Sequence, residues 1–121
     1  MYYSFENLEV WKRACNLAVH IYDLLQCSTD YGLRDQMQRS AVSIASNIAE
    51  GSERSGKDFA RYLTIARGSA AELRTQTYIA AKIGQIPLEV MTEIVKETRE
   101  ISRMLTGLAK SVIKRQRSKI E

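Results

Sequence analysis

Apolar residues recur at alternating steps of three and four along four segments of this chain, a period that indicates amphipathic helices. The segments cover residues 7–26, 33–50, 57–83 and a stretch that begins at Pro87. The row of the third segment keeps these steps throughout: Phe59, Leu63, Ala66, Ala70, Leu73, Thr77 and Ala80. No segment shows the polar-apolar alternation of a half-buried strand. The sequence therefore predicts an all-α fold.

Short breaks separate the four segments. Loop-forming residues fill 27–32 and 51–56, Gly84 fits the end of a helix, and Pro87 fits the first turn of the next one. Ser55 is expected to cap the third helix in a capping-box arrangement. Because connections this short make consecutive helices antiparallel, the sequence predicts an up-down-up-down four-helix bundle.

The net charge of +4 is concentrated at the C-terminal end of the chain. Residues 1–109 are electrically balanced and are expected to form the bundle, which argues against a strongly basic surface there. Residues 110–121 are expected to form a basic helix end or tail. Such an end favours a polyanion, although a frayed and solvated helix end has the same composition. Its cations are Lys110, Lys114, Arg115, Arg117 and Lys119.

Two segments, 39–51 and 65–73, place small or polar residues where a surface helix would carry Lys and Glu. Helices with such faces can approach closely, and polar groups caught between them need partners. Gly68 costs its helix about 1 kcal/mol relative to Ala, which a helix packed over it would offset. A tight hairpin would place Ser40 opposite Gly68 and Gln36 opposite Glu72. These groups are expected to serve helix contacts within or between subunits, or to bind a ligand.

The residues needed for catalysis are missing. His20 is the only histidine and lies on a polar helix side, so no Ser-His-Asp set can be assigned. Glu50 and Glu72 lie on different predicted helices, and no helical Glu-x-x-His motif accompanies them to bind a pair of metal ions. The sequence predicts a protein that is not an enzyme and that needs neither a cofactor nor a metal.

Cysteine use and hydropathy bear on location. Cys15 and Cys27 lie about 18 Å apart along one predicted helix, too far for a disulfide within it. No apolar run approaches the roughly 18 residues needed to span a bilayer, and the N-terminus lacks a signal-peptide pattern. We expect a cytoplasmic protein with no membrane partner.

Three motifs along the first three predicted helices carry a family resemblance. They are Phe5-x-x-Leu8-x-Val10-Trp11-Lys12-x-Ala14, Leu33-x-x-Gln36-x-x-Arg39-Ser40-Ala41-x-Ser43-Ile44-x-x-Asn47-Ile48-Ala49-Glu50-Gly51, and Ile65-Ala66-Arg67-Gly68-Ser69-Ala70-x-Glu72-Leu73. The chain resembles the four-helix bundle proteins encoded within intervening sequences of bacterial 23S ribosomal RNA genes. The resemblance implies a left-handed antiparallel bundle that assembles as a ring-shaped homopentamer. It extends to the accessory proteins of diversity-generating retroelements, basic pentamers that bind a reverse transcriptase and nucleic acid.

The first functional hypothesis is a non-enzymatic homopentamer that binds RNA or other nucleic acid and is associated with rRNA intervening sequences. Repetition around a ring would strengthen contacts to phosphate that are individually weak. The residues expected to bind nucleic acid are Lys110, Lys114, Arg115, Arg117, Lys119, Arg39, Arg54 and Arg67.

The alternative is a scaffold that recruits a partner protein, such as a reverse transcriptase. A balanced bundle with polar small-residue faces favours it. The residues expected at the oligomer or partner interface are Ser43, Asn47, Glu50, Arg54, Arg67, Gly68 and Glu72.

Overall fold

The structure, a computed structural model, describes residues 4–120, with side chains for residues 4–118. It confirms the predicted all-α fold with four long helices, and the residues it describes contain no strand. The elements are the short 3-10 turn η1 (Phe5–Asn7), α1 (Glu9–Leu25), α2 (Tyr31–Ser52), α3 (Gly56–Lys82) and α4 (Leu88–Ile120).

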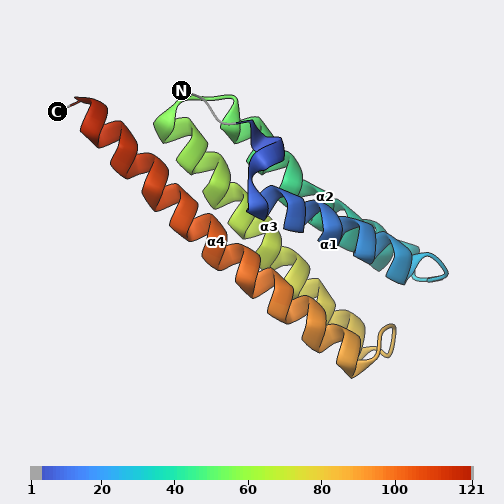
Figure 1. Cartoon of the computed structure of the whole chain (residues 1–121). Coiled ribbons are helices and arrows are strands. Elements are labelled where there is room, and N and C mark those ends of the chain that lie inside the picture. The colour runs from blue at the N-terminus through green and yellow to red at the C-terminus, as the bar shows by residue number, and fades with distance from the viewer. Residues whose placement is uncertain (1–3, 121) are drawn as a thin grey trace.

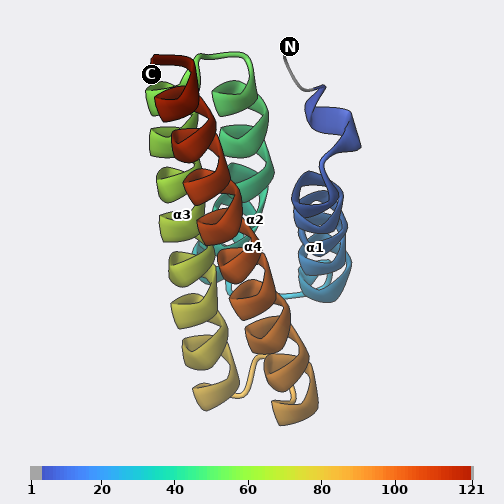
Figure 2. The ribbon, with the colours of Figure 1, turned by 60° about the vertical axis from the view of Figure 1, so that its left-hand side comes forward.

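The four helices form a closed bundle. Each helix packs against its neighbours in the chain, and α1 also packs against α4. Within the described part of the chain the diagonal pairs, α1 with α3 and α2 with α4, have no Cα atoms within 8 Å of each other. Consecutive helices run in opposite directions (Figure 1), and α1 and α3 lie on opposite sides with α2 and α4 between them (Figure 2). The left-handed twist stays a prediction.

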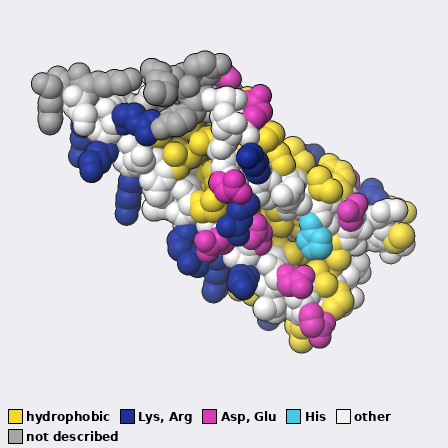
Figure 3. Space-filling view, in the orientation of Figure 1, with side chains coloured by type: hydrophobic (Ala, Val, Ile, Leu, Met, Phe, Trp, Pro, Cys, Tyr) yellow, Lys and Arg dark blue, Asp and Glu magenta, His cyan; other side chains and the backbone are white. Residues whose placement is uncertain are grey.

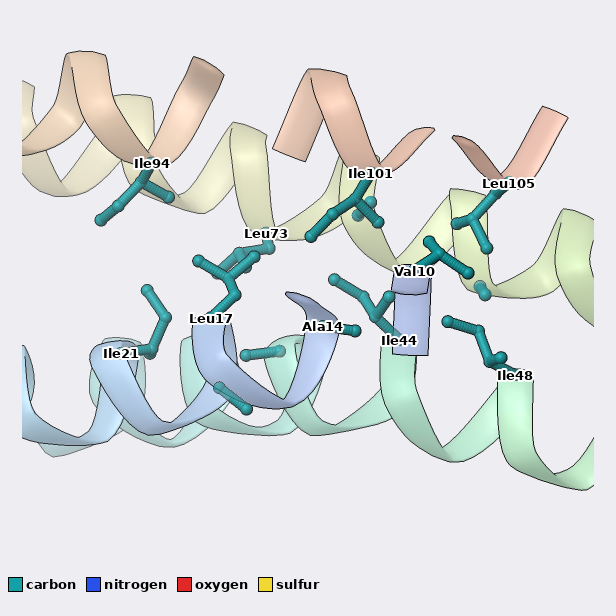
Figure 4. Close-up of a cluster of buried hydrophobic side chains, with 14 of the residues drawn as sticks. Val10, Ala14, Leu17, Ile21, Ile44, Ile48, Leu73, Ile94, Ile101 and Leu105 are labelled. Atoms are coloured by element: carbon teal, nitrogen blue, oxygen red, sulfur yellow. The ribbon is translucent and has the colours of Figure 1, made fainter. Parts of the chain in front are cut away.

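The core consists largely of apolar rows with steps of three and four, and the row predicted for the third helix, from Phe59 to Ala80, is buried throughout. Side chains from all four helices point into the centre of the bundle (Figure 4), and all are buried: Val10, Ala14, Leu17, Ile21, Ile44, Ile48, Leu73, Ile94, Ile101 and Leu105. Two threonines of these rows, Thr77 and Thr98, are also fully buried. Their hydroxyls donate to the carbonyls of Leu73 and Val95 at 2.7 and 2.8 Å, which satisfies both polar groups inside the core.

Local capping explains where the helices begin and end. α2 begins two residues earlier than predicted because Asp30 caps it, its Oδ1 accepting from the backbone N–H of Leu33 at 3.1 Å. Ser55 does precede α3, but its side chain makes no capping hydrogen bond, so the predicted capping box is wrong. Gly84 ends α3 with a φ of 79°, a left-handed conformation that glycine adopts without strain.

Helix α4 continues without a break across the boundary that the charge pattern suggests at residue 110. Val112 is buried in the core, and Gln116 packs against Gly56 at the start of α3. The basic C-terminal residues are therefore held on a rigid helix at least as far as Gln116.

Cys15 and Cys27 are both free thiols. Cys15 is partly covered within α1, and its burial raises the pKa of the thiol. Cys27 lies exposed in the loop after α1.

We predict opposite effects for alanine at two helical glycines. A Cβ at Gly51 would lie 2.6 Å from the Cβ of Tyr62 and 3.1 Å from a ring carbon of Phe59. The helices would have to separate, so Gly51→Ala should lower the free energy of unfolding by about 1–3 kcal/mol. A Cβ at Gly68 meets no described atom within 4 Å, so Gly68→Ala should raise that free energy by about 1 kcal/mol.

Urea unfolding at one fixed protein concentration measures both changes. A stabilising Gly51→Ala would contradict the close packing of α2 on α3. A destabilising Gly68→Ala would instead mean that a second copy of the chain packs over Gly68.

Candidate nucleic-acid interface

Basic and acidic residues lie on different sides of α4. At about 100° per residue, six exposed cations fall within about 60° of its circumference. They span about 32 Å along the axis at 1.5 Å per residue. We call this set the α4 stripe, and its members are Lys96, Arg99, Arg103, Lys110, Lys114 and Arg117.

The described carboxylates of α4 lie on the adjoining flank, about 80–160° around from Arg99. They are Glu89, Glu93, Glu97 and Glu100. Glu97 accepts two hydrogen bonds from Arg13 of α1, one of them from Nε to Oε2 at 3.0 Å. This hydrogen-bonded carboxylate raises the pKa of Arg13. The ion pair thus shows that the acidic flank lies toward α1, and each of its two side chains is 32% exposed.

The surface shows the same separation. Lys and Arg side chains gather along the lower-left edge of the molecule in Figure 3, over α4. Asp and Glu side chains lie nearer the middle of that view, between α4 and α1. A body that is neutral in sum therefore carries a basic face.

Helix α3 places further arginines beside the α4 stripe. Arg74 lines a shallow groove of about 560 Å³ together with Arg99, Arg103 and Lys110. No carboxylate of the described residues lines this groove. Two turns before Arg74, Arg67 donates to a threonine hydroxyl of α4 at 2.9 Å. Arg67 and Arg74 thus form a second basic row parallel to the stripe.

Three of the five cations predicted at the C-terminal end lie on the stripe. Lys110, Lys114 and Arg117 are exposed there. Arg115 falls on the side of α4 that carries the acidic flank, about 160° around from Arg99. The side chain of Lys119 lies outside the described residues.

The other three predicted nucleic-acid residues are divided between two faces. Arg67 lies beside the stripe, whereas Arg39 and Arg54 belong to α2 or the turn after it. Neither lies on α4: Arg39 is on α2, whose Cα atoms stay more than 8 Å from those of α4 in the described chain, and Arg54 stands over the Tyr62 ring at the α2–α3 turn. Sequence reasoning also missed Lys96, Arg99 and Arg103 as binding candidates. Their spacing in the sequence places them on the same side of the helix as the C-terminal cations. They were missed because charge was summed along the chain and not around the helix.

The polar residues between α2 and α3 satisfy one another. Ser69 Oγ donates to the carbonyl of Ile65 at 3.3 Å, so it accepts from Ser43 Oγ at 2.9 Å. Asn47 Nδ2 donates to the carbonyl and the hydroxyl of Ser43 at 2.8 and 3.0 Å. Ser43 and Asn47 therefore serve a helix contact within one chain.

The pairing of α2 with α3 differs by one helical turn from the expected one. The Ser43–Ser69 bond and a contact between Glu50 and Tyr62 place Ser40 near Glu72, not opposite Gly68. Steric fit decides this register, because Gly51 is the residue that lets the side chain of Tyr62 approach α2. Nothing in the described chain covers Gly68, so the expected helix over it is absent from the single chain.

A second charged cluster lies where α2 turns into α3. Tyr62 Oη donates to Glu50 Oε1 at 3.4 Å, and Arg54 donates to the same oxygen at 3.5 Å. The guanidinium groups of Arg54 and Arg61 both stand 4.9 Å from the centre of the Tyr62 ring. We call Glu50, Arg54, Arg61 and Tyr62 the turn cluster.

Glu50 and Glu72, the two carboxylates considered above as a metal-binding pair, are both exposed. Glu50 belongs to the turn cluster. Glu72 lines a groove of about 460 Å³ between α2 and α3, with Arg39 and Gln76 among its other residues. Within the described chain the Oε1 atom of Gln76 is buried without a hydrogen-bond partner.

Other types of site find no support among the described residues. No group of three or more His, Cys, Asp or Glu side chains is arranged there to hold a metal ion. None of the described helices has the length and apolar character to cross a membrane. His20 is exposed on α1.

Residues 6–107 match a family model described as 23S rRNA-intervening sequence protein. Among solved structures, the chain is similar to a protein of unknown function from the S23 ribosomal protein family of Bacteroides thetaiotaomicron. The two are 27% identical with a TM-score of 0.78, over 84% of this chain and 98% of that chain. No curated protein matches this chain significantly. Neither description names a catalytic activity.

We predict that the ion pair between Arg13 and Glu97 is the strongest on α4. A double-mutant cycle with Arg13→Gln and Glu97→Gln should give a coupling energy of about 1 kcal/mol, because the pair is bidentate and partly covered. The control cycle uses Arg103→Gln and Glu100→Gln, an exposed pair at 3.4 Å. Its coupling should stay below about 0.5 kcal/mol. Equal couplings in urea unfolding would contradict an acidic flank fixed against α1.

Proposed function

The chain belongs to the 23S rRNA-intervening sequence protein family, and we propose that it is a non-enzymatic homopentamer that binds RNA or other nucleic acid. The observation that carries the proposal is the separation of charge on α4. An aligned row of exposed cations suits a phosphate backbone, whose charges repeat at short intervals. A mixed surface of the same net charge would not.

The binding we propose is electrostatic and largely independent of base sequence. Lysine and arginine side chains contact phosphate, and each contact releases counterions, so affinity falls as salt rises. A ring of five chains would present five stripes to one polyanion. Linked contacts of this kind raise overall affinity without any new chemistry.

We predict that the triple variant Arg103→Gln, Lys110→Gln, Lys114→Gln binds RNA at least about tenfold more weakly at 100 mM salt. The slope of log affinity against log salt should become shallower by about one for each phosphate that the variant no longer neutralises. Fluorescence anisotropy with a labelled RNA measures both quantities.

The matched control is Lys12→Gln, Lys57→Gln, Lys82→Gln. It removes the same charge from exposed positions away from the stripe. Equal losses of affinity in the two variants would mean that net charge alone drives binding, and the stripe would not be the site. Binding by the unaltered protein that ignores salt would contradict the proposal altogether.

We predict that light scattering on the purified protein gives a mass near five chains. Peak fractions should carry excess absorbance at 260 nm from bound nucleic acid. A pentamer free of nucleic acid would favour the scaffold function described below. A monomer would contradict the ring.

The scaffold function is favoured by the turn cluster. An exposed surface that combines tyrosine with two arginines has the composition of a protein-interaction hot spot. In this function Glu50→Ala would disrupt the pentamer or the complex with a partner protein such as a reverse transcriptase, and removal of residues 110–121 would leave that complex intact. Loss of the complex on truncation would contradict it.

A further inference from the structure

We infer that the basic face binds the phosphate backbone of a double helix in preference to a single strand. The inference rests on the proposed function and narrows its substrate class. Two features carry it: the two parallel rows of cations, and the aromatic side chains around them.

The cations stand in two rows on rigid neighbouring helices. The α4 stripe forms the long row, and Arg67 with Arg74 on α3 forms the short one. Packed helices lie about 8–10 Å apart, which falls between the widths of the two grooves of a B-form duplex, about 6 and 12 Å. Where two such rows cross a groove, each row can contact one of the two phosphate strands that border it. A single strand offers only one line of phosphates.

The rigidity of helix α4 also favours a duplex over a single strand. The stripe is one unbroken helical segment of about 32 Å, roughly the length of ten base pairs at 3.4 Å each. A duplex holds its phosphates at fixed positions, so it docks on a rigid row with little loss of conformational freedom. A single strand must be ordered as it binds, and that ordering opposes binding.

The aromatic residues argue against single strands. Proteins that bind single strands stack bases on aromatic side chains, which offsets the ordering. Of the described aromatic residues, Tyr78 is the one shown in contact with the stripe. Its hydroxyl accepts from Arg99 at 3.5 Å, and the residue is 37% exposed. Tyr62 belongs to the turn cluster, and Phe5 packs edge-on against Trp11 beside α1.

The experiment compares four labelled ligands in one buffer by fluorescence anisotropy: an RNA duplex and a DNA duplex of about 20 base pairs, and one strand of each. We expect each duplex to bind at least about tenfold more tightly than its strand. The tighter of the two duplexes identifies the nucleic acid. Strands that bind as tightly as duplexes overturn the inference and leave the proposed function standing. Failure of all four ligands to bind overturns both.

A pair of double variants tests the two-row geometry. Arg67→Gln, Arg74→Gln should weaken duplex binding at least about fivefold and change single-strand binding by less than about twofold. The control, Lys12→Gln, Lys57→Gln, removes the same charge from exposed positions outside the basic face and should change neither. A first variant that weakens duplex and strand equally would overturn the two-row geometry. Circular dichroism and light scattering check that both variants keep the fold and mass of the parent protein.

Discussion

The close approach of α2 and α3 is the contact on which the rest of the bundle depends. Gly51 leaves no room for a side chain against Tyr62 and Phe59, and the hydroxyls of Ser43 and Ser69 meet at 2.9 Å. A tight hairpin of this kind fixes the register of α3. It leaves the opposite side of α3 free to pack against α4, and it thereby decides which arginines of α3 stand beside the α4 stripe.

The basic face follows from how α4 divides its circumference. One side is apolar and buried, and the acidic flank is held toward α1 by the ion pair between Arg13 and Glu97. The remaining side carries the stripe and faces solvent beside α3. The two signs of charge thus lie on different sides of α4, although Arg103 of the stripe and Glu100 of the acidic flank pair at 3.4 Å. Long-range attraction of a polyanion depends on that separation more than on net charge.

The sequence predicted features that depend on the spacing of apolar residues, such as the positions of the helices. It missed features that depend on how side chains fit between helices, such as the register of α2 against α3. The rows of three and four steps defined the four helices and the buried side of α3, and Gly84 marked the end of α3. The capping box at Ser55 failed because its side chain makes no hydrogen bond to the first turn of α3, which a local motif cannot decide. The α2–α3 pairing was one turn out because the register depends on how Tyr62 packs on Gly51. Lys96, Arg99 and Arg103 were missed because charge was summed along the chain and not around α4.

The two functional hypotheses name some of the same residues, but these residues lie on different surfaces of the molecule. Arg54 and Arg67 belong to both predicted sets, yet Arg54 lies in the turn cluster at the end of α2, and Arg67 contacts α4 beside the stripe. The turn cluster adjoins only the C-terminal end of the stripe, where Gln116 packs against Gly56, and the rest of the stripe extends away from it along α4. Nucleic-acid binding and partner recruitment would therefore be compatible in one molecule. Substitutions at Arg54 and Arg67 would separate them, each affecting the surface on which it lies.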